Sequence, residues 1–229
     1  MITQTKAKMF LADERGHNEL DWFRSYSTFN FGNYQHEHKS AFGSLYALND
    51  DTLAGNKKLS YFIAENSFVI LLPLIGAVEY TDSNGNIFLL QAGEAQLCNL
   101  KKGSTIILSN QYEKETVNFL HIWVKNNFDS TSKEIDHVVF DVEVKNKLLP
   151  IFKNNSLSVL LGKYDGRADD IYKLSSFDNS VFAFVIDGVF EVQNRLLHAR
   201  DGLALWETKE IEFEALSNEA IILLVECGV

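Results

Sequence analysis

Apolar residues along the chain follow the two-residue period of β-strands far more often than the 3.6-residue period of helices. Short runs rich in β-branched and aromatic residues recur and are closed by turn sequences. The segment AVEYTDSNGNIFLL predicts a hairpin that turns at Asn84-Gly85, because this dipeptide accepts the positive φ angles of a tight turn. The segment VFEVQNRLLHA repeats the arrangement around Gln193-Asn194. These patterns predict an all-β protein.

Two parts of the chain share one layout. FVILLPLIGAVEY and VFAFVIDGVFEV each hold an apolar run, a glycine and a continuing strand, and Gly188 stands where Gly76 stands. A duplicated plan of short antiparallel strands predicts two tandem β-barrels of the jelly-roll type. Pro73 has no N–H to donate to a ladder, so it indicates a sheet edge or a bulge.

The polar segment 126–136, NNFDSTSKEID, carries no periodic apolar face and is the best candidate for a linker. We therefore expect an N-terminal barrel at 1–125 and a C-terminal barrel at 137–229. With 229 residues, 46% of them apolar, the chain is long enough for two domains that each bury a core.

Composition and charge exclude several classes of partner. A net charge of −10 without a basic cluster argues against nucleic-acid binding, which needs Lys and Arg gathered on one surface. The N-terminus lacks the apolar stretch of a secretory signal, and the longest apolar run, 68–78, is too short for a membrane helix. Cys98 and Cys227 form no disulfide or metal-binding pattern. We expect a cytoplasmic protein without a membrane partner.

The histidines are the first candidates for chemistry. His36 and His38 in YQHEH have the spacing that points two imidazoles to one side of a strand, as metal sites require. A pair without further ligands carries little weight, so a solvated loop is the better interpretation. Surface positions are expected for His17, His137 and His198, which lie among polar neighbours.

His121 lies in FLHIWV, where it shares a strand face with Phe119 and Trp123. This alternation makes His121 and Trp123 candidates for lining a pocket inside the first barrel. The alternative interpretation is a core histidine whose ring is satisfied by a backbone carbonyl.

A longer motif indicates a family. A tryptophan is followed by Ser-x-x-Thr-Phe and by Phe-x-Asn-Tyr, and this run resembles the start of the first domain in the pirin family of bicupins. The residues are Trp22, Ser25, Thr28, Phe29, Phe31, Asn33 and Tyr34. The similarity continues through GAVEYTDSNGN and FLHIWV, and NRLLHARDGLALWE resembles the second cupin domain of bacterial pirin-like quercetin dioxygenases. The resemblance covers nearly the whole chain and implies a bicupin fold and a monomer.

The resemblance also implies a metal, usually iron, held inside the N-terminal barrel by three histidines and a glutamate. Counting along the sequence from Gly76 and from Gly93 places all four ligands on side chains that cannot bind a metal. These vacated positions are Phe62, Ala64, Ile106 and Leu108. No histidine lies between His38 and His121, so a shift of the alignment by a residue or two restores none of them.

These observations lead to three hypotheses. The first is a pirin-related bicupin with a degenerate, metal-free site and no cofactor, which binds a small apolar ligand or a protein partner without catalysis. The alternative is a metal-dependent oxidoreductase like quercetin 2,3-dioxygenase, with a rearranged metal shell of His121 and His36 or His38. A third is a metal-free enzyme that uses His121 as a general base. The sequence leaves open whether the protein is an enzyme.

Overall fold

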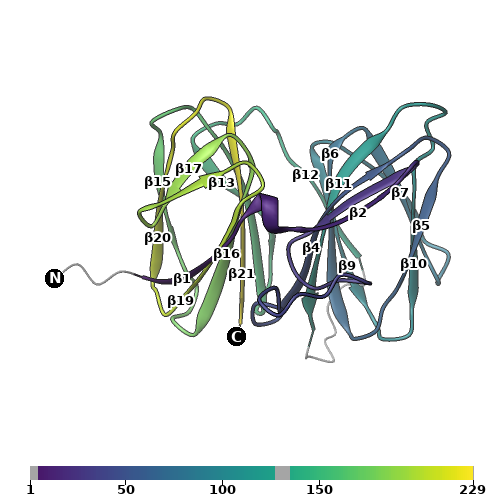
Figure 1. Ribbon diagram of the computed structural model, residues 1–229, viewed down its shortest axis with the longest axis horizontal. Coiled ribbons are helices and arrows are strands. Elements are labelled where there is room, and N and C mark those ends of the chain that lie inside the picture. Colours follow the sequence, from purple (N-terminus) through teal and green to yellow (C-terminus); the bar gives the residue numbers. More distant parts are fainter. Residues whose placement is uncertain (1–4, 127–134, 229) are drawn as a thin grey trace. The chain divides into compact units, whose positions relative to one another are not determined.

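The computed structural model describes residues 5–126 and 135–228. These residues form antiparallel strands and one short 3-10 helix, Ala12–Glu14, as Figure 1 shows. The predicted all-β class is confirmed. Within this part of the chain, no helix is long and apolar enough to cross a membrane.

The chain divides into two compact units. We call Gly16–Val139 the first barrel, and the second barrel combines the described part of residues 1–15 with residues 140–228. Each unit consists of one large and one small antiparallel sheet that enclose a hydrophobic core. This arrangement confirms the predicted pair of tandem antiparallel barrels.

The large sheet of the first barrel has the strand order β12-β9-β6-β11-β4-β3-β2, and the small sheet has the order β5-β10-β7-β8. The strands are β2 (Gly16–Leu20), β3 (Phe23–Ser27), β4 (Leu45–Leu53), β5 (Lys58–Phe62), β6 (Ser67–Ile75), β7 (Ala77–Asp82), β8 (Ile87–Gln91), β9 (Glu94–Leu100), β10 (Thr105–Ser109), β11 (Val117–Lys125) and β12 (Ile135–Val139). Because side chains alternate along a strand, every second residue enters the core, as Val69 and Leu71 do from β6.

The second barrel repeats this plan. Its large sheet has the order β1-β19-β16-β21-β14-β13 and its small sheet β15-β20-β17-β18, so β14 to β21 follow the order of β4 to β11. The strands are β1 (Lys6–Phe10), β13 (Lys147–Lys153), β14 (Leu157–Tyr164), β15 (Asp169–Lys173), β16 (Asn179–Asp187), β17 (Val189–Val192), β18 (Arg195–His198), β19 (Gly202–Trp206), β20 (Glu210–Ala215) and β21 (Ala220–Gly228). Gly76 and Gly188 have matching φ angles of 76° and 78°, which confirms the predicted duplication.

Both predicted hairpin turns are present. Gln193 and Asn194 connect β17 to β18 with φ angles of 48° and 59°, the left-handed pair that two-residue hairpins favour. In the first barrel, Gly85 has a φ of 83° between β7 and β8. There the Asp82 carboxylate accepts hydrogen bonds from the backbone N–H groups of Asn84 and Asn86, at 2.8 and 3.0 Å.

Pro73 lies in a bulge. Its strand, β6, is hydrogen-bonded on both sides, to β9 and to β11, so Pro73 is not on an edge strand. The register with β11 changes between the pairs Asn118–Ile75 and Phe119–Pro73. The extra residue on β6 forms the bulge that the missing N–H of proline predicted.

The predicted domain boundaries are wrong at two strands. β1 pairs with β19, so the start of the chain belongs to the second barrel and not to a domain at 1–125. β12 pairs with β9, so the first barrel extends into the range assigned to the linker and the second domain. Both strands complete the edge of a large sheet and show little apolar alternation, so the sequence pattern did not reveal them. Most of the predicted linker, 127–134, lies outside the described residues.

The pairing of β1 can be tested by removing a side chain at the start of the chain. Phe10 is 2% exposed and its ring centre lies 5.5 Å from that of Phe182 on β16. We expect Phe10→Ala to lower the free energy of unfolding of the second barrel by about 3–5 kcal/mol, measured by urea denaturation. Met9, which is 40% exposed on the other face of β1, is the control, and Met9→Ala should cost roughly 0.5 kcal/mol or less. Equal effects would contradict the packing of β1.

Candidate functional site

Strands β4 and β11 carry polar side chains into the first barrel. Asn49 and Asp51 alternate with outward residues of β4 and therefore share the interior face of this strand. On the neighbouring strand, His121 is paired directly with Asn49, and Trp123 follows on the same face. All four side chains are buried. The predicted interior position of His121 and Trp123 is confirmed.

Asp51 is the centre of a hydrogen-bonded chain. Its Oδ2 atom accepts a hydrogen bond from the Tyr61 hydroxyl at 2.6 Å and lies 3.0 Å from His121 Nε2. The Trp123 indole N–H donates to His121 Nδ1 at 2.7 Å. An indole nitrogen can only donate, so Nδ1 is the unprotonated nitrogen and the Nε2–H group donates to Asp51. The imidazole is therefore neutral and is held in one tautomer from both sides.

The Tyr61 hydroxyl keeps its proton. Burial, the negative charge of Asp51 and the hydrogen bond to Asp51 all raise the pKa of Tyr61 well above its ordinary value. Tyr61 comes from β5 in the small sheet, whereas Asp51 comes from β4 in the large sheet. The hydrogen bond therefore connects the two sheets across the barrel.

Aromatic rings surround the imidazole. The ring centre of His121 lies 4.9 Å from that of Tyr61 and 5.6 Å from that of Phe31. The Phe31 ring also makes an edge contact with Trp123, at 5.4 Å between centres. Phe31 is only half-buried and belongs to the irregular segment 28–44 between β3 and β4. A loop side chain therefore covers the buried polar group.

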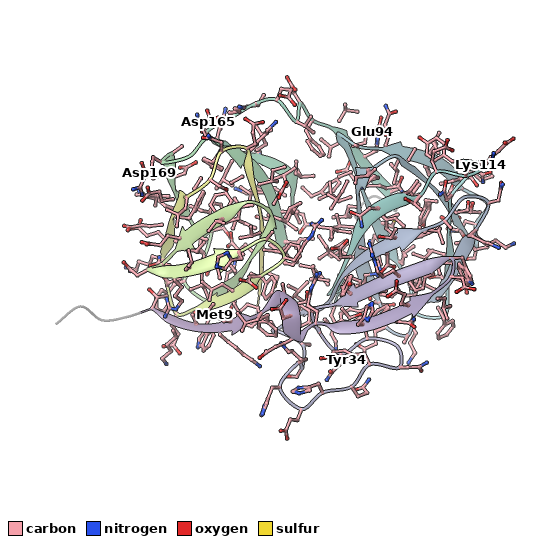
Figure 2. All side chains as sticks on the ribbon, turned by 45° about the horizontal axis from the view of Figure 1, so that its top comes forward. Met9, Tyr34, Glu94, Lys114, Asp165 and Asp169 are labelled. Atoms are coloured by element: carbon pink, nitrogen blue, oxygen red, sulfur yellow. The ribbon has the colours of Figure 1, made fainter. Side chains whose placement is uncertain are left out.

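Hydrogen bonds within the 28–44 segment and a contact with β2 hold this segment in place. Asn30 donates from its side chain to the carbonyl of His36 and accepts from the His36 N–H, at 3.1 and 2.8 Å. Tyr34, labelled in Figure 2, packs its ring on Gly16, where an added Cβ would lie 2.3 Å from the nearest ring atom. Gly16 is thus a position where only a glycine allows the loop to approach the strand.

Several buried polar atoms in the barrel have no hydrogen-bond partner among the described residues. They are Asp51 Oδ1, both amide atoms of Asn49, Gln96 Oε1 and Thr28 Oγ1. Asn49 and Asp51 were not predicted as functional residues, although the alternation Ala47, Asn49, Asp51, Leu53 was the signal that could have identified them. The interior is therefore less apolar than the sequence suggested.

The four predicted ligand positions divide into two pairs. Ile106 and Leu108 are fully buried in the core of the first barrel, as expected. Phe62 is 64% exposed and Ala64 is also exposed, so the inward orientation expected for this pair is wrong. The inward residues there are Tyr61 and Ile63. The Pro73 bulge and the turn after β5 both lie between Gly76 and this pair. Each of them can shift the strand alternation by one residue, so a count from Gly76 does not show which residues of β5 face inward.

The corrected positions do not fit the metal centre that the family resemblance implies. Iron in a cupin requires several nitrogen or oxygen donors that converge on one point. The inward side chains are instead Ile63, Ile106 and Leu108, together with a Tyr61 phenol that donates to Asp51. In the described ranges, no three His, Cys, Asp or Glu side chains come together to hold a metal ion.

The other histidines lie at the surface, as predicted. His36 and His38 are exposed on the 28–44 segment, where His38 Nε2 lies 3.1 Å from the Glu37 carboxylate. His17 and His137 are exposed beside Glu19 and Glu94, and His198 is exposed at the end of β18. His121 uses both ring nitrogens for side-chain hydrogen bonds, so the expected backbone carbonyl is not its partner.

The second barrel holds a buried carboxylate of its own, Glu226 on β21. Its Oε1 atom accepts hydrogen bonds from the Ser175 N–H and hydroxyl, at 2.9 and 2.6 Å, and from the side chain of Asn179. Its Oε2 atom accepts from the Tyr172 hydroxyl. Burial opposes the charge, but the bonds from Asn179, Ser175 and Tyr172 prevail and lower the pKa of Glu226. Both oxygens of this carboxylate are satisfied.

Comparisons with known proteins agree with the fold. The family model described as "Quercetinase C-terminal cupin domain" matches residues 154–227. The chain is 26% identical over 220 residues to a quercetin 2,3-dioxygenase of Escherichia coli (strain K12), with 93% of this chain and 95% of that protein covered. It is 27% identical over 124 residues to the pirin-like protein YhaK of the same strain, covering 54% of this chain and 51% of that protein.

Solved structures show the same architecture. YhhW from Escherichia coli superposes with a TM-score of 0.86 at 21% identity, and 97% of each chain is covered. The bacterial pirin YhhW in complex with nickel(II), also from Escherichia coli, gives a TM-score of 0.84 at 22% identity, with 97% of this chain and 99% of that chain covered. These similarities establish the fold.

The hydrogen bond to His121 can be tested with Trp123→Phe, which keeps an aromatic ring but removes the indole N–H. His121 Nδ1 would then be buried without a donor, so we expect a loss of about 1–3 kcal/mol in the free energy of unfolding. Trp22→Phe is the control, since Trp22 is a half-buried indole that packs on the same core. A Trp123→Phe protein as stable as the control would contradict this hydrogen bond.

The lowered pKa of Glu226 predicts a pH dependence. A carboxyl group whose pKa is lower in the folded state adds stability above its unfolded pKa, and this contribution is lost as the pH falls through the folded value. Glu226→Gln should therefore melt at a lower temperature than the parent at pH 7, and the difference should shrink between about pH 5 and pH 3. Glu191→Gln removes an exposed carboxylate in the same barrel and should show neither effect. A constant difference at all pH values would refute the assignment.

Proposed function

We propose that this pirin-like bicupin is a binding protein whose first barrel works without a catalytic metal. The supporting observation is the set of inward side chains on β5 and β10: Tyr61, Ile106 and Leu108 contribute to the core, and none of them is a histidine or a carboxylate. Hydrocarbon side chains at these positions contribute to the core. Unpaired histidines and a glutamate would instead incur a desolvation cost in the absence of an ion.

A rearranged metal shell has less support. The hypothesis needs a free nitrogen on His121, yet both of its nitrogens are committed to Asp51 and Trp123. The exposed His36 and His38 lie on the 28–44 loop, where the His36 N–H donates to Asn30 and the His38 N–H donates to His36 Nδ1. The activity in the name of the quercetin 2,3-dioxygenase relative is therefore not proposed for this chain.

A binding role has support from the same barrel. The Asp51 and Asn49 side chains are fully buried and hold polar atoms without a partner in the described part of the chain, which a purely structural core avoids. Half-buried Phe31, on a loop, is the cover between this group and the outside. We therefore assign binding to the interior of the first barrel. A cytoplasmic location is a separate part of the proposal.

The proposal can be tested on protein purified without a metal-chelating tag. Mass spectrometry of the metals should find far less than one iron, nickel, copper, manganese or zinc per chain, also after incubation with each ion and desalting. Oxygen consumption with quercetin should equal the buffer rate. The nickel-bound Escherichia coli bacterial pirin serves as the positive control for metal retention. One retained metal per chain together with quercetin turnover would overturn the proposal.

A further inference from the structure

We propose that Asp51 and Asn49 bind a small flat molecule that presents hydrogen-bond donors and carries no negative charge. This inference rests on the proposed binding function and specifies its ligand. Asp51 and Asn49 lie two residues apart on the interior face of β4, and both are fully buried. Asp51 Oδ1 and both amide atoms of Asn49 lack a partner in the described parts of the chain.

The second barrel shows how this chain satisfies a carboxylate that serves structure alone. Glu226 is as buried as Asp51 and also accepts a hydrogen bond from a tyrosine of the small sheet. Its other oxygen accepts from Ser175 and Asn179, so neither oxygen is unpartnered. Asp51 has the same kind of tyrosine partner on Oδ2, but its Oδ1 has no partner among residues 5–126 and 135–228. The difference points to a donor that comes from outside the chain.

Charge determines which ligands fit. His121 accepts a hydrogen bond on Nδ1 and is neutral, so it does not compensate the negative charge of the Asp51 carboxylate. A ligand with N–H groups supplies the missing donors, and a positive charge also supplies the missing counter-charge. A carboxylate ligand offers only acceptors and adds repulsion in a chain of net charge −10. The free Asn49 amide can donate to an acceptor or accept from a second donor.

The aromatic rings around His121 determine the shape of ligand that we expect. The ring centres of Phe31 and Tyr61 lie 5.6 and 4.9 Å from that of His121, so the imidazole that binds Asp51 lies beside two aromatic rings. The half-buried Phe31 ring reaches this position from the 28–44 loop and contacts both His121 and Trp123. A flat aromatic molecule with a polar end group matches this arrangement.

Three probes of one shape test the inference: benzamidine, benzamide and benzoate. Benzamidine is a cation whose two NH₂ groups both donate hydrogen bonds. Benzamide is neutral, with one NH₂ donor and one carbonyl acceptor. Benzoate is an anion whose two oxygens only accept. Titration calorimetry at pH 7 should rank their affinities in that order, with no measurable binding of benzoate. Equal affinities, binding of benzoate alone, or binding of none of the three would overturn the inference.

Variants locate the binding on the proposed atoms. Asp51→Asn should weaken benzamidine at least tenfold, because it removes the charge while keeping the shape. Asp50→Asn is the matched control, since Asp50 is the neighbouring carboxylate on the opposite face of β4. The Asp50→Asn variant should bind benzamidine with the affinity of the parent protein. Loss of binding in both variants, or in neither, would refute the assignment to Asp51.

Stability without ligand gives a second readout that does not depend on the probes. Asn49→Leu replaces two unpartnered polar atoms by hydrocarbon of similar size, so the ligand-free variant should melt several degrees above the parent and lose benzamide and benzamidine binding. A lower melting temperature would show that Asn49 is already satisfied in the free protein, which overturns the inference. If the protein holds no metal but its affinities for the three probes do not follow the expected order, this inference alone is refuted. If it retains a metal and turns over quercetin, the proposed function is refuted.

Discussion

One carboxylate oxygen, Asp51 Oδ2, connects both sheets of the first barrel. It accepts from Tyr61 on β5 of the small sheet and from His121 on β11 of the large sheet, and Asp51 itself lies on β4. The Trp123 indole then fixes the other side of the imidazole. Because a buried hydrogen bond to a charged group is stronger than a neutral one, these hydrogen bonds fix the positions of three strands and of three rings, those of Tyr61, His121 and Trp123. The aromatic cover and the inward direction of Tyr61 follow from it.

The sequence predicted the parts of the fold that depend on local chemistry. Asn84-Gly85 and Gln193-Asn194 favour tight turns, and Gly85, Gln193 and Asn194 do have positive φ angles, so both turns could be identified from the residues alone. Pro73 cannot donate to a ladder, which predicted a sheet edge or a bulge, and the structure shows the bulge. The family motif around Trp22 supplied the bicupin architecture. The position of His121 followed from simple alternation within one strand.

The parts that failed depend on interactions between distant segments. β1 is a strand because the edge of β19 offers it a partner, and its own pattern does not show this. The inward side of β5 could not be counted from Gly76, because the bulge at Pro73 and the turn between Phe62 and Ser67 interrupt the alternation. Asn49 and Asp51 were missed because polar residues in a strand usually face solvent, and only the folded barrel shows that these two are buried.

The tandem barrels contain two solutions to one problem, the burial of an acidic group. Glu226 recruits donors from Ser175, Asn179 and Tyr172 until its charge is fully solvated by the protein. Within the described residues, Asp51 receives donors on Oδ2 and none on Oδ1. Within a single chain, the two barrels thus separate a carboxylate that stabilises a domain from one that leaves free energy available for binding.

The pairing of β1 with β19 has a consequence for synthesis on the ribosome. Lys6–Phe10 is made before the first barrel, whereas its partner Gly202–Trp206 is made after the first barrel and after most of the second. At about 5–20 residues per second, the strand waits roughly 10–40 s without its partner, while all of 16–139 has already been translated. The alternating Lys6 and Lys8 keep this waiting segment hydrated and discourage pairing with other nascent chains. The second barrel therefore includes a strand that precedes the whole first barrel in the sequence, and that strand can pair only once β19 has been made.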